Sequence, residues 1–247
     1  MLAGLALLAL SVQAGASPTT ELPSRVARIV LHTLGGPFYG DPSMRFVFLD
    51  PPATFRRWAR PSFGAHWIVW TDGGLWPRHP RAGEPPSVIP PVDAPLSPAW
   101  RERLAVDAAP VYAHVEGANR DSVGIELSHS GRSRDPFPPA QVRTVAWLIR
   151  SLLAMSEGRL TEVSVTGHKD LDDEPAYVVD DCRGPGCAYY VDAAGRAFRR
   201  RVDPPESLFR ALAESGLHIP RHSGEGDDQL ERTRALGPTE VPRVFQP

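Results

Sequence analysis

Residues 28–33 read Arg-Ile-Val-Leu-His-Thr, a short apolar run that ends on a histidine, His32. Consecutive branched and apolar side chains predict a buried β-strand over residues 28–32, central in its sheet. Residues 162–166 repeat the pattern, because they lead through Gly167 into a second histidine, His168. Each strand therefore brings an imidazole to a sheet edge, where a side chain can point into a cleft.

The rest of the chain alternates strand-like and helical segments. Further strands are expected at residues 64–71, 111–114 and 122–128. Asp72-Gly73-Gly74 predicts a hairpin turn leading into Leu75 and Trp76. Helices are predicted at residues 52–59, 138–155 and 205–215, each with proline at its start. This alternation predicts an α/β fold, a single domain in which helices flank a central mixed β-sheet.

Length and composition agree with one large domain. The chain has 247 residues, 42% of them hydrophobic, and the domain is expected to span residues 25–216. Residues 77–98 are rich in proline and predict a long surface loop, whereas the polar residues 221–247 predict a flexible tail. The net charge of −2 and the absence of a nucleic-acid motif exclude a broad attraction to nucleic acid.

The first residues and the two cysteines indicate an exported protein. A short apolar stretch followed by small residues up to Ala16 predicts a signal peptide at residues 1–16, and hence a periplasmic or extracellular location. The alternative is a mildly apolar disordered tail, and the stretch is too short to span a membrane. Cys182 and Cys187 bracket a turn-like tetrapeptide, which favours a local disulfide in an exported protein. Two free thiols or a zinc pair are the alternatives.

Three segments carry residues suited to metal chemistry. Two imidazoles and one carboxylate would leave the fourth position of a zinc ion open, as in catalytic zinc sites. Asp203 is the carboxylate that best accompanies His32 and His168, although its spacing alone is better explained by a position near a helix N-terminus. Three carboxylates nearer to His168 are the rival ligands and are expected in a solvated acidic loop, namely Asp170, Asp172 and Asp173. Glu126 lies in an apolar strand, where burial would raise its pKa and suit acid–base work; an ion pair with an arginine is the alternative.

Five segments, in their order along the chain, resemble the zinc-dependent N-acetylmuramoyl-L-alanine amidases of the type-2 amidase family. That family is similar to the peptidoglycan-recognition proteins of animals. The resemblance extends from about residue 28 to residue 213. It rests on five segments, at residues 28–32, 63–73, 114–126, 167–170 and 201–204.

The resemblance implies a zinc ion held by His32, His168 and Asp203 in a cleft at the sheet edge. It implies that Glu126 is the catalytic base and that Arg201 stabilises the oxyanion. It further implies contacts with substrate by the polar residues of the second and third segments, His66, His114 and Asn119. The expected reaction cleaves the amide bond between N-acetylmuramic acid and L-alanine. The expected partners are peptidoglycan or muropeptides, and the enzyme is expected to be a monomer.

Two departures from the family pattern leave alternatives open. Arg201 stands where the family has a lysine, and arginine is a poor proton donor of different shape. The interval from His168 to Asp203 holds an insertion at residues 171–200, in which a hairpin is expected at residues 191–198 with a turn at Ala194-Gly195. Asp181 or Cys182 would then be the alternative third ligand. A peptidoglycan-binding protein without activity, or a zinc amidase for another amide, are the alternative functions.

Overall fold

The computed structural model describes residues 20–33, 64–78, 85, 87–115, 117–129, 136–171, 187–191, 197–201, 204–220 and 234–235. The main sheet consists of five strands, β1 (Arg28–Thr33), β2 (Trp67–Val69), β3 (Leu75–Pro77), β4 (Ser122–Leu127) and β5 (Val165–Gly167). The helices are α2 (Pro98–Ala108), α3 (Pro139–Met155), α4 (His168–Leu171) and α5 (Glu206–Glu214), with a 3₁₀ turn, η2, at Glu162–Ser164. Among the described residues, no helix has the length and apolar character that a membrane crossing requires.

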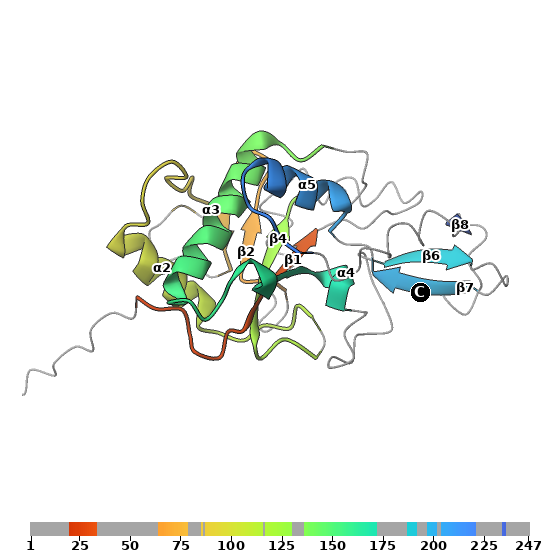
Figure 1. Cartoon of the computed structure of the whole chain (residues 1–247), viewed down its shortest axis with the longest axis horizontal. Helices are drawn as coiled ribbons and strands as arrows, with labels where there is room; N and C mark the ends of the chain where they lie inside the picture. Colours follow the sequence, from red (N-terminus) through yellow and green to blue (C-terminus); the bar gives the residue numbers. More distant parts are fainter. Residues whose placement is uncertain are drawn as a thin grey trace, which may run out of the picture.

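The five strands lie in the order β3-β2-β4-β1-β5 (Figure 1). Strand β1 runs parallel to both β4 and β5, and β2 runs parallel to β4. Only β3 is antiparallel, because it returns from β2 through a tight turn. The sheet is therefore mixed and flanked by helices, which confirms the predicted fold class, and β1 lies in its interior as its apolar sequence indicates.

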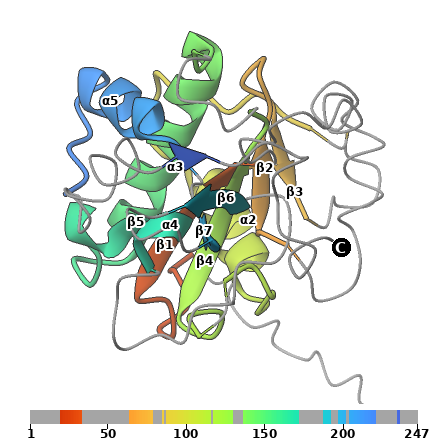
Figure 2. The same ribbon diagram turned by 90° about the vertical axis from the view of Figure 1, so that its right-hand side faces the viewer.

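The two faces of the sheet have different roles. Successive side chains of a strand point to opposite faces. Val123, Ile125 and Leu127 of β4 belong to the main hydrophobic core, together with the buried side chains of α3. Figure 2 shows α3 and α5 together on this side of the sheet. The alternate residues of β4, which include Glu126, lie on the other face, and this face carries the candidate site.

The hairpin and the two main helices follow the sequence pattern. In the turn between β2 and β3, Gly73 has a φ of +86°, and Asp72 Oδ1 accepts a hydrogen bond from the Gly74 N–H at 2.8 Å. This combination explains the predicted Asp-Gly-Gly turn, since glycine adopts positive φ without steric cost. Helices α3 and α5 match the segments predicted at 138–155 and 205–215.

Three segments differ from their predictions. Helix α2 begins where the sequence predicts the end of the surface loop; Ser97 accepts a hydrogen bond from the Trp100 N–H, and Pro98 occupies the first turn. Residues 111–114 do not form a strand. The segment at 162–166 starts as η2, because the Thr161 and Ser164 side chains cap each other's backbone N–H groups, and becomes a strand only at Val165.

A second, small sheet contains β6 (Cys187–Val191), β7 (Ala197–Arg201) and β8 (Arg234–Ala235). Strands β6 and β7 are antiparallel, with Val191 opposite Ala197, so the predicted hairpin forms and its strands extend further than residues 191–198. Strand β8, within the segment predicted as a flexible tail, pairs with β6. The predicted signal peptide and the helix predicted at residues 52–59 lie outside the described residues.

Candidate metal centre

The structure brings His32 and His168 together. Leu31 of β1 pairs with Gly167 of β5 in a parallel register, so the residues that follow them, His32 and His168, lie at the same level. Both imidazoles are buried, and their Nδ1 atoms lie 2.9 Å apart. Two residues that are 136 positions apart in sequence thus meet at one edge of the sheet.

The distance between these two nitrogens fits a shared metal ion. Two ligands at about 2.0–2.1 Å from a tetrahedral zinc ion lie roughly 3.3 Å from each other, so a shift of under about half an ångström would accommodate the ion. Imidazole is also a common ligand for zinc. Within the described ranges no three or more His, Cys, Asp or Glu side chains are arranged so that together they could hold a metal ion. The pair therefore supplies two ligands, and the predicted third, Asp203, lies outside the described residues.

Glu126 lies next to His32 on the neighbouring strand. The two residues are register partners in the parallel pairing of β1 with β4. Partners on adjacent parallel strands lie about 4.8 Å apart along the hydrogen-bonding direction and project to the same face. The Glu126 side chain is buried, with 7% of its surface exposed. The predicted base and the predicted ligand are thus held side by side by the sheet itself.

His114 packs behind His32, on the side away from His168. Its Nδ1 lies 3.1 Å from His32 Nε2, and its Nε2 lies 3.1 Å from the Ser122 hydroxyl oxygen. Gly124 makes room for the ring, because a Cβ at that position would lie 2.7 Å from His114 Nδ1. Burial, reinforced by the neighbouring histidines His66 and His168, holds the pKa of His114 well below its ordinary value.

His66 and Asn119 hold the backbone around His114. His66 Nδ1 accepts from the Gly124 N–H at 3.0 Å, and its Nε2 donates to the Pro110 carbonyl at 3.0 Å. Asn119 Oδ1 accepts from the backbone N–H of His114 at 2.7 Å and of Val115 at 2.8 Å. These contacts give both residues a structural role, and the contacts with substrate predicted for His66, His114 and Asn119 stay predictions.

Arg25 joins the two ends of the segment that carries His114 through hydrogen bonds. Its guanidinium donates to backbone carbonyls before and after this segment, those of Ala108, Ala109, Pro110, Arg120 and Ser122. Five carbonyls on one side chain tie the start and the end of the loop together. The position of His114 is therefore fixed from the backbone as well as from its ring.

The buried imidazole of His66 makes stability depend on pH. Burial lowers its pKa from 6.5 to about 3, so between these values the unfolded chain binds a proton that the folded chain does not. Stability therefore falls as the pH falls below 6.5. We expect the contribution of His66 to lower the free energy of unfolding by about 2 kcal/mol between pH 8 and pH 5. Urea unfolding of the metal-free protein measures this loss. His66→Gln, whose amide can serve both backbone partners, should flatten the acid side of the curve, and an unchanged slope would contradict the assignment.

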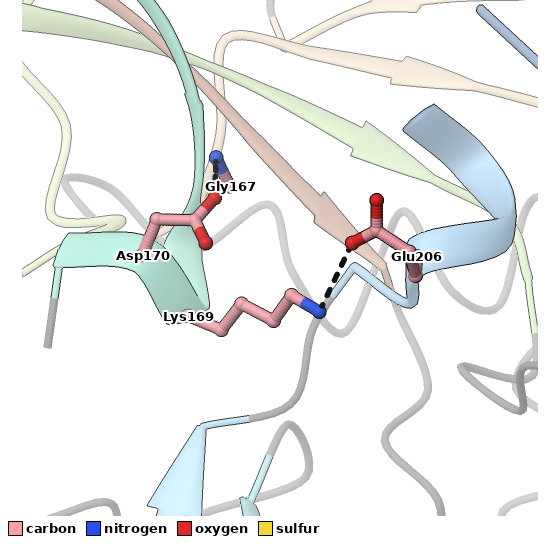
Figure 3. A network of polar contacts seen from close by, with 4 residues as sticks. All are labelled: Gly167, Lys169, Asp170 and Glu206. Carbon is pink, nitrogen blue, oxygen red and sulfur yellow. Dashed lines mark hydrogen bonds and ion pairs between the residues drawn. The ribbon is translucent and has the colours of Figure 1, made fainter. Parts of the chain in front are cut away.

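The short helix α4 carries His168 and is held by two polar contacts (Figure 3). Asp170 is buried, and its Oδ2 accepts from the Gly167 N–H at 2.9 Å, so the predicted solvated position of this carboxylate is wrong. Lys169, the only lysine of the chain, is also buried, and its Nζ lies 3.7 Å from Glu206 Oε2 on α5. Helix α4 is thus tied both to the end of β5 and to the first turn of α5.

The predicted site residues of the later segments are only partly described. Arg201 ends β7, where its backbone pairs opposite Cys187, and the side chains of both lie outside the described residues, as does Cys182. Pro204, which follows Asp203, is buried. A Cβ on Gly167 would lie 3.1 Å from Pro204 Cδ and 3.2 Å from Phe209 Cζ, so only glycine allows this close packing. Pro204 therefore lies beside the residue that precedes His168.

Sequence reasoning missed the part played by Ser122 and Gly124. Both lie on the same face of β4 as Glu126, because positions 122, 124 and 126 alternate with core positions. The signal was present in the sequence as Ser-x-Gly-x-Glu, two small residues spaced by two before a carboxylate. Small residues on the site face leave space for a ring above the strand.

Comparison with known proteins gives one informative match. The family model described as N-acetylmuramoyl-L-alanine amidase, of the type-2 amidases, matches residues 22–185, about two thirds of the chain. Among curated proteins, no sequence matches.

Some solved structures resemble the chain weakly. AmpDH3 from Pseudomonas aeruginosa is 16% identical, over 97% of this chain and 85% of its own, with a TM-score of 0.41. The endolysin amidase LysCS from Clostridium intestinale is 17% identical, over 61% of this chain and 73% of its own, with a TM-score of 0.33. The assignment rests on the family model alone: the chain belongs to the type-2 N-acetylmuramoyl-L-alanine amidase family.

Proposed function

We propose that this protein is a zinc-dependent amidase that cleaves the bond between N-acetylmuramic acid and L-alanine in peptidoglycan or in muropeptides. Family membership supports a peptidoglycan amidase activity. The observation that carries the zinc dependence is the buried pair of His32 and His168 nitrogens, 2.9 Å apart at the sheet edge. A buried pair of imidazoles whose ring nitrogens converge is a favourable start for a zinc site.

We assign the third ligand to Asp203. Two observations support this choice over Asp181 or Cys182. Pro204 packs against Gly167, one residue from His168, and Lys169 beside His168 forms an ion pair with Glu206. Both contacts hold the segment that directly follows Asp203 against the helix that bears His168. This placement of the described residues from Pro204 onward supports Asp203, the residue before Pro204, as the third ligand.

The residues of the chain have separate tasks in the proposed reaction. A bound zinc ion would polarise the carbonyl of the scissile amide and acidify a water molecule. Glu126 takes a proton from the attacking water and returns it to the leaving nitrogen of L-alanine. Arg201 donates hydrogen bonds to the oxygen that becomes negatively charged in the transition state. Burial of Glu126 beside His32 supports the first task by keeping the carboxylate at the level of the proposed ligand.

Mass spectrometry of peptidoglycan digests tests the function. Intact peptidoglycan is incubated with zinc-loaded protein and, as a control, with protein in excess chelator. Free stem peptides that begin with L-alanine, present only in the zinc-loaded sample, are the expected result. Intact muropeptides despite bound zinc would contradict the proposal and point to another amide substrate or to a binding protein.

We further propose that the protein is exported and acts as a monomer. The apolar stretch at residues 1–16 supports export to the periplasm or to the outside of the cell. The proposed disulfide between Cys182 and Cys187 agrees with such a location. Detection of the mature chain in the periplasmic or culture fraction, with its mass by native mass spectrometry, tests both statements.

A further inference from the structure

A continuous chain of hydrogen-bonding groups leads from the protein backbone to His32. It begins at the Ala118 carbonyl, passes through the Ser122 hydroxyl and the His114 ring, and ends on His32. All of its members are buried or half-buried on the site face of the sheet. The donor and acceptor of the first contact are fixed by chemistry, and they determine the direction of each later hydrogen bond in turn.

The first link settles the state of Ser122. Its Oγ lies 2.5 Å from the Ala118 carbonyl oxygen, which can only accept. The single hydroxyl proton of Ser122 therefore points at Ala118. Toward His114 the same oxygen is left with lone pairs, so it accepts a proton from His114 Nε2 across 3.1 Å.

The second link follows from the first. A neutral imidazole that carries its proton on Nε2 has a bare Nδ1. His114 Nδ1 lies 3.1 Å from His32 Nε2, so it accepts the proton that His32 carries there. His32 then has its own Nδ1 free of a proton, and this is the atom that faces His168 Nδ1 at 2.9 Å.

We infer that His114, oriented by Ser122, is a positioning residue that fixes the tautomer and the ring orientation of His32, so that His32 presents the lone pair of Nδ1 to a metal ion. This inference rests on the proposed zinc site. Metal-binding histidines are oriented by the partner of their second nitrogen, and such a partner raises metal affinity. Here the partner is another histidine, His114, which contacts the second nitrogen of the proposed ligand.

Gly124 and Arg25 belong to the same arrangement. The absence of a Cβ at Gly124 lets the His114 ring approach β4, because a Cβ would lie 2.7 and 2.9 Å from two of the ring atoms. Arg25 fixes the backbone before and after the loop through five carbonyls. The ring of His114 is thus restrained by contacts at both nitrogens, by β4 at Gly124 and through the backbone of its loop. A positioning role requires such restraint.

Two substitutions of similar volume separate the hydrogen bond from the packing. In His114→Asn the amide oxygen can take the place of Nδ1 and still accept from His32, whereas His114→Leu offers no acceptor. We expect the zinc dissociation constant, measured by competition with a chromophoric chelator, to rise about 10- to 100-fold in His114→Leu and by a few-fold in His114→Asn. His129→Leu serves as the matched control, because it removes a buried histidine that does not belong to the hydrogen-bonded series from Ala118 to His32.

Nitrogen-15 NMR of the histidine rings gives a readout independent of activity. In the zinc-loaded wild type, His32 should carry its proton on Nε2 with slow solvent exchange. In His114→Leu that proton should exchange fast or the ring should coordinate through its other nitrogen. Unchanged zinc affinity and an unchanged His32 spectrum in His114→Leu would overturn the inference.

The experiment distinguishes this inference from the proposed function. If wild type and His168→Ala bind zinc equally, the proposed site itself is wrong. If His168→Ala loses zinc while His114→Leu matches the wild type, only the positioning role fails. Should His114→Leu not fold, as judged by thermal unfolding of the metal-free protein, Ser122→Ala tests the same chain, and the inference then requires a several-fold loss of zinc affinity.

Discussion

Replacement of His168 by alanine is expected to remove zinc and to lower the rate of muropeptide hydrolysis by roughly a thousandfold or more, because a proposed ligand and its lone pair are lost. His168 is buried at the start of α4, directly after β5, and its Nδ1 lies 2.9 Å from His32 Nδ1. Alanine offers no ligand at this point, and the remaining imidazole and carboxylate hold a zinc ion weakly. Zinc content by atomic emission, together with the rate of stem-peptide release, measures the change.

His218→Ala is the matched control for this experiment. His218 is exposed after α5, so its loss should change neither zinc content nor turnover. A His168→Ala protein that retains one zinc ion per chain would show that the ligand assignment is wrong. A protein that loses zinc and keeps its activity would instead refute the zinc dependence of the reaction.

Glu126→Gln should separate catalysis from metal binding. Glutamine preserves the size of the side chain and cannot take a proton from water, so kcat is expected to fall about 10²- to 10⁴-fold. Zinc content should stay at the wild-type level, since the proposed ligands are His32, His168 and Asp203. Steady-state kinetics and metal analysis of the same preparation provide both values.

The control for Glu126→Gln is Glu21→Gln, which removes a carboxylate from an exposed position outside the sheet. Near-normal turnover in Glu126→Gln would remove this residue from the mechanism. Loss of zinc in the same variant would assign Glu126 to the metal instead, as a ligand in place of Asp203.

The fold followed from the sequence wherever the hydrophobic pattern was strong. Val30 and its neighbours predicted an interior strand, and the spacing of Val142, Val145 and Ile149 predicted α3, because burial of an apolar face determines both elements. Helix α2 was missed because its apolar residues are interrupted by arginines and only Leu104, Ala105 and Ala108 are buried. The start signal Ser97-Pro98 was present, but it follows a proline-rich segment that favours a loop.

The candidate site was predictable only as far as strand order allowed. His32 and His168 each follow an apolar strand, so their meeting needed only the assumption that the two strands are parallel neighbours. The contact between His114 and Ser122 depends on how the loop between residues 115 and 121 returns to the sheet, and no periodic pattern encodes that path. The sequence therefore indicated which residues are suited to binding a metal ion, but not that His114 contacts the second nitrogen of His32.

Strand β4 has a consequence for protein engineering. Its six residues separate into two sets of three that face opposite sides of the sheet, one in the hydrophobic core and one under the imidazoles. Substitutions at positions 123, 125 and 127 change the packing of the core and are expected to act on stability. A library directed at altered metal preference or substrate range belongs at positions 122, 124 and 126 and in the loop that bears His114. A six-residue strand thus offers two separate design surfaces, and randomising it as a whole would mix their effects.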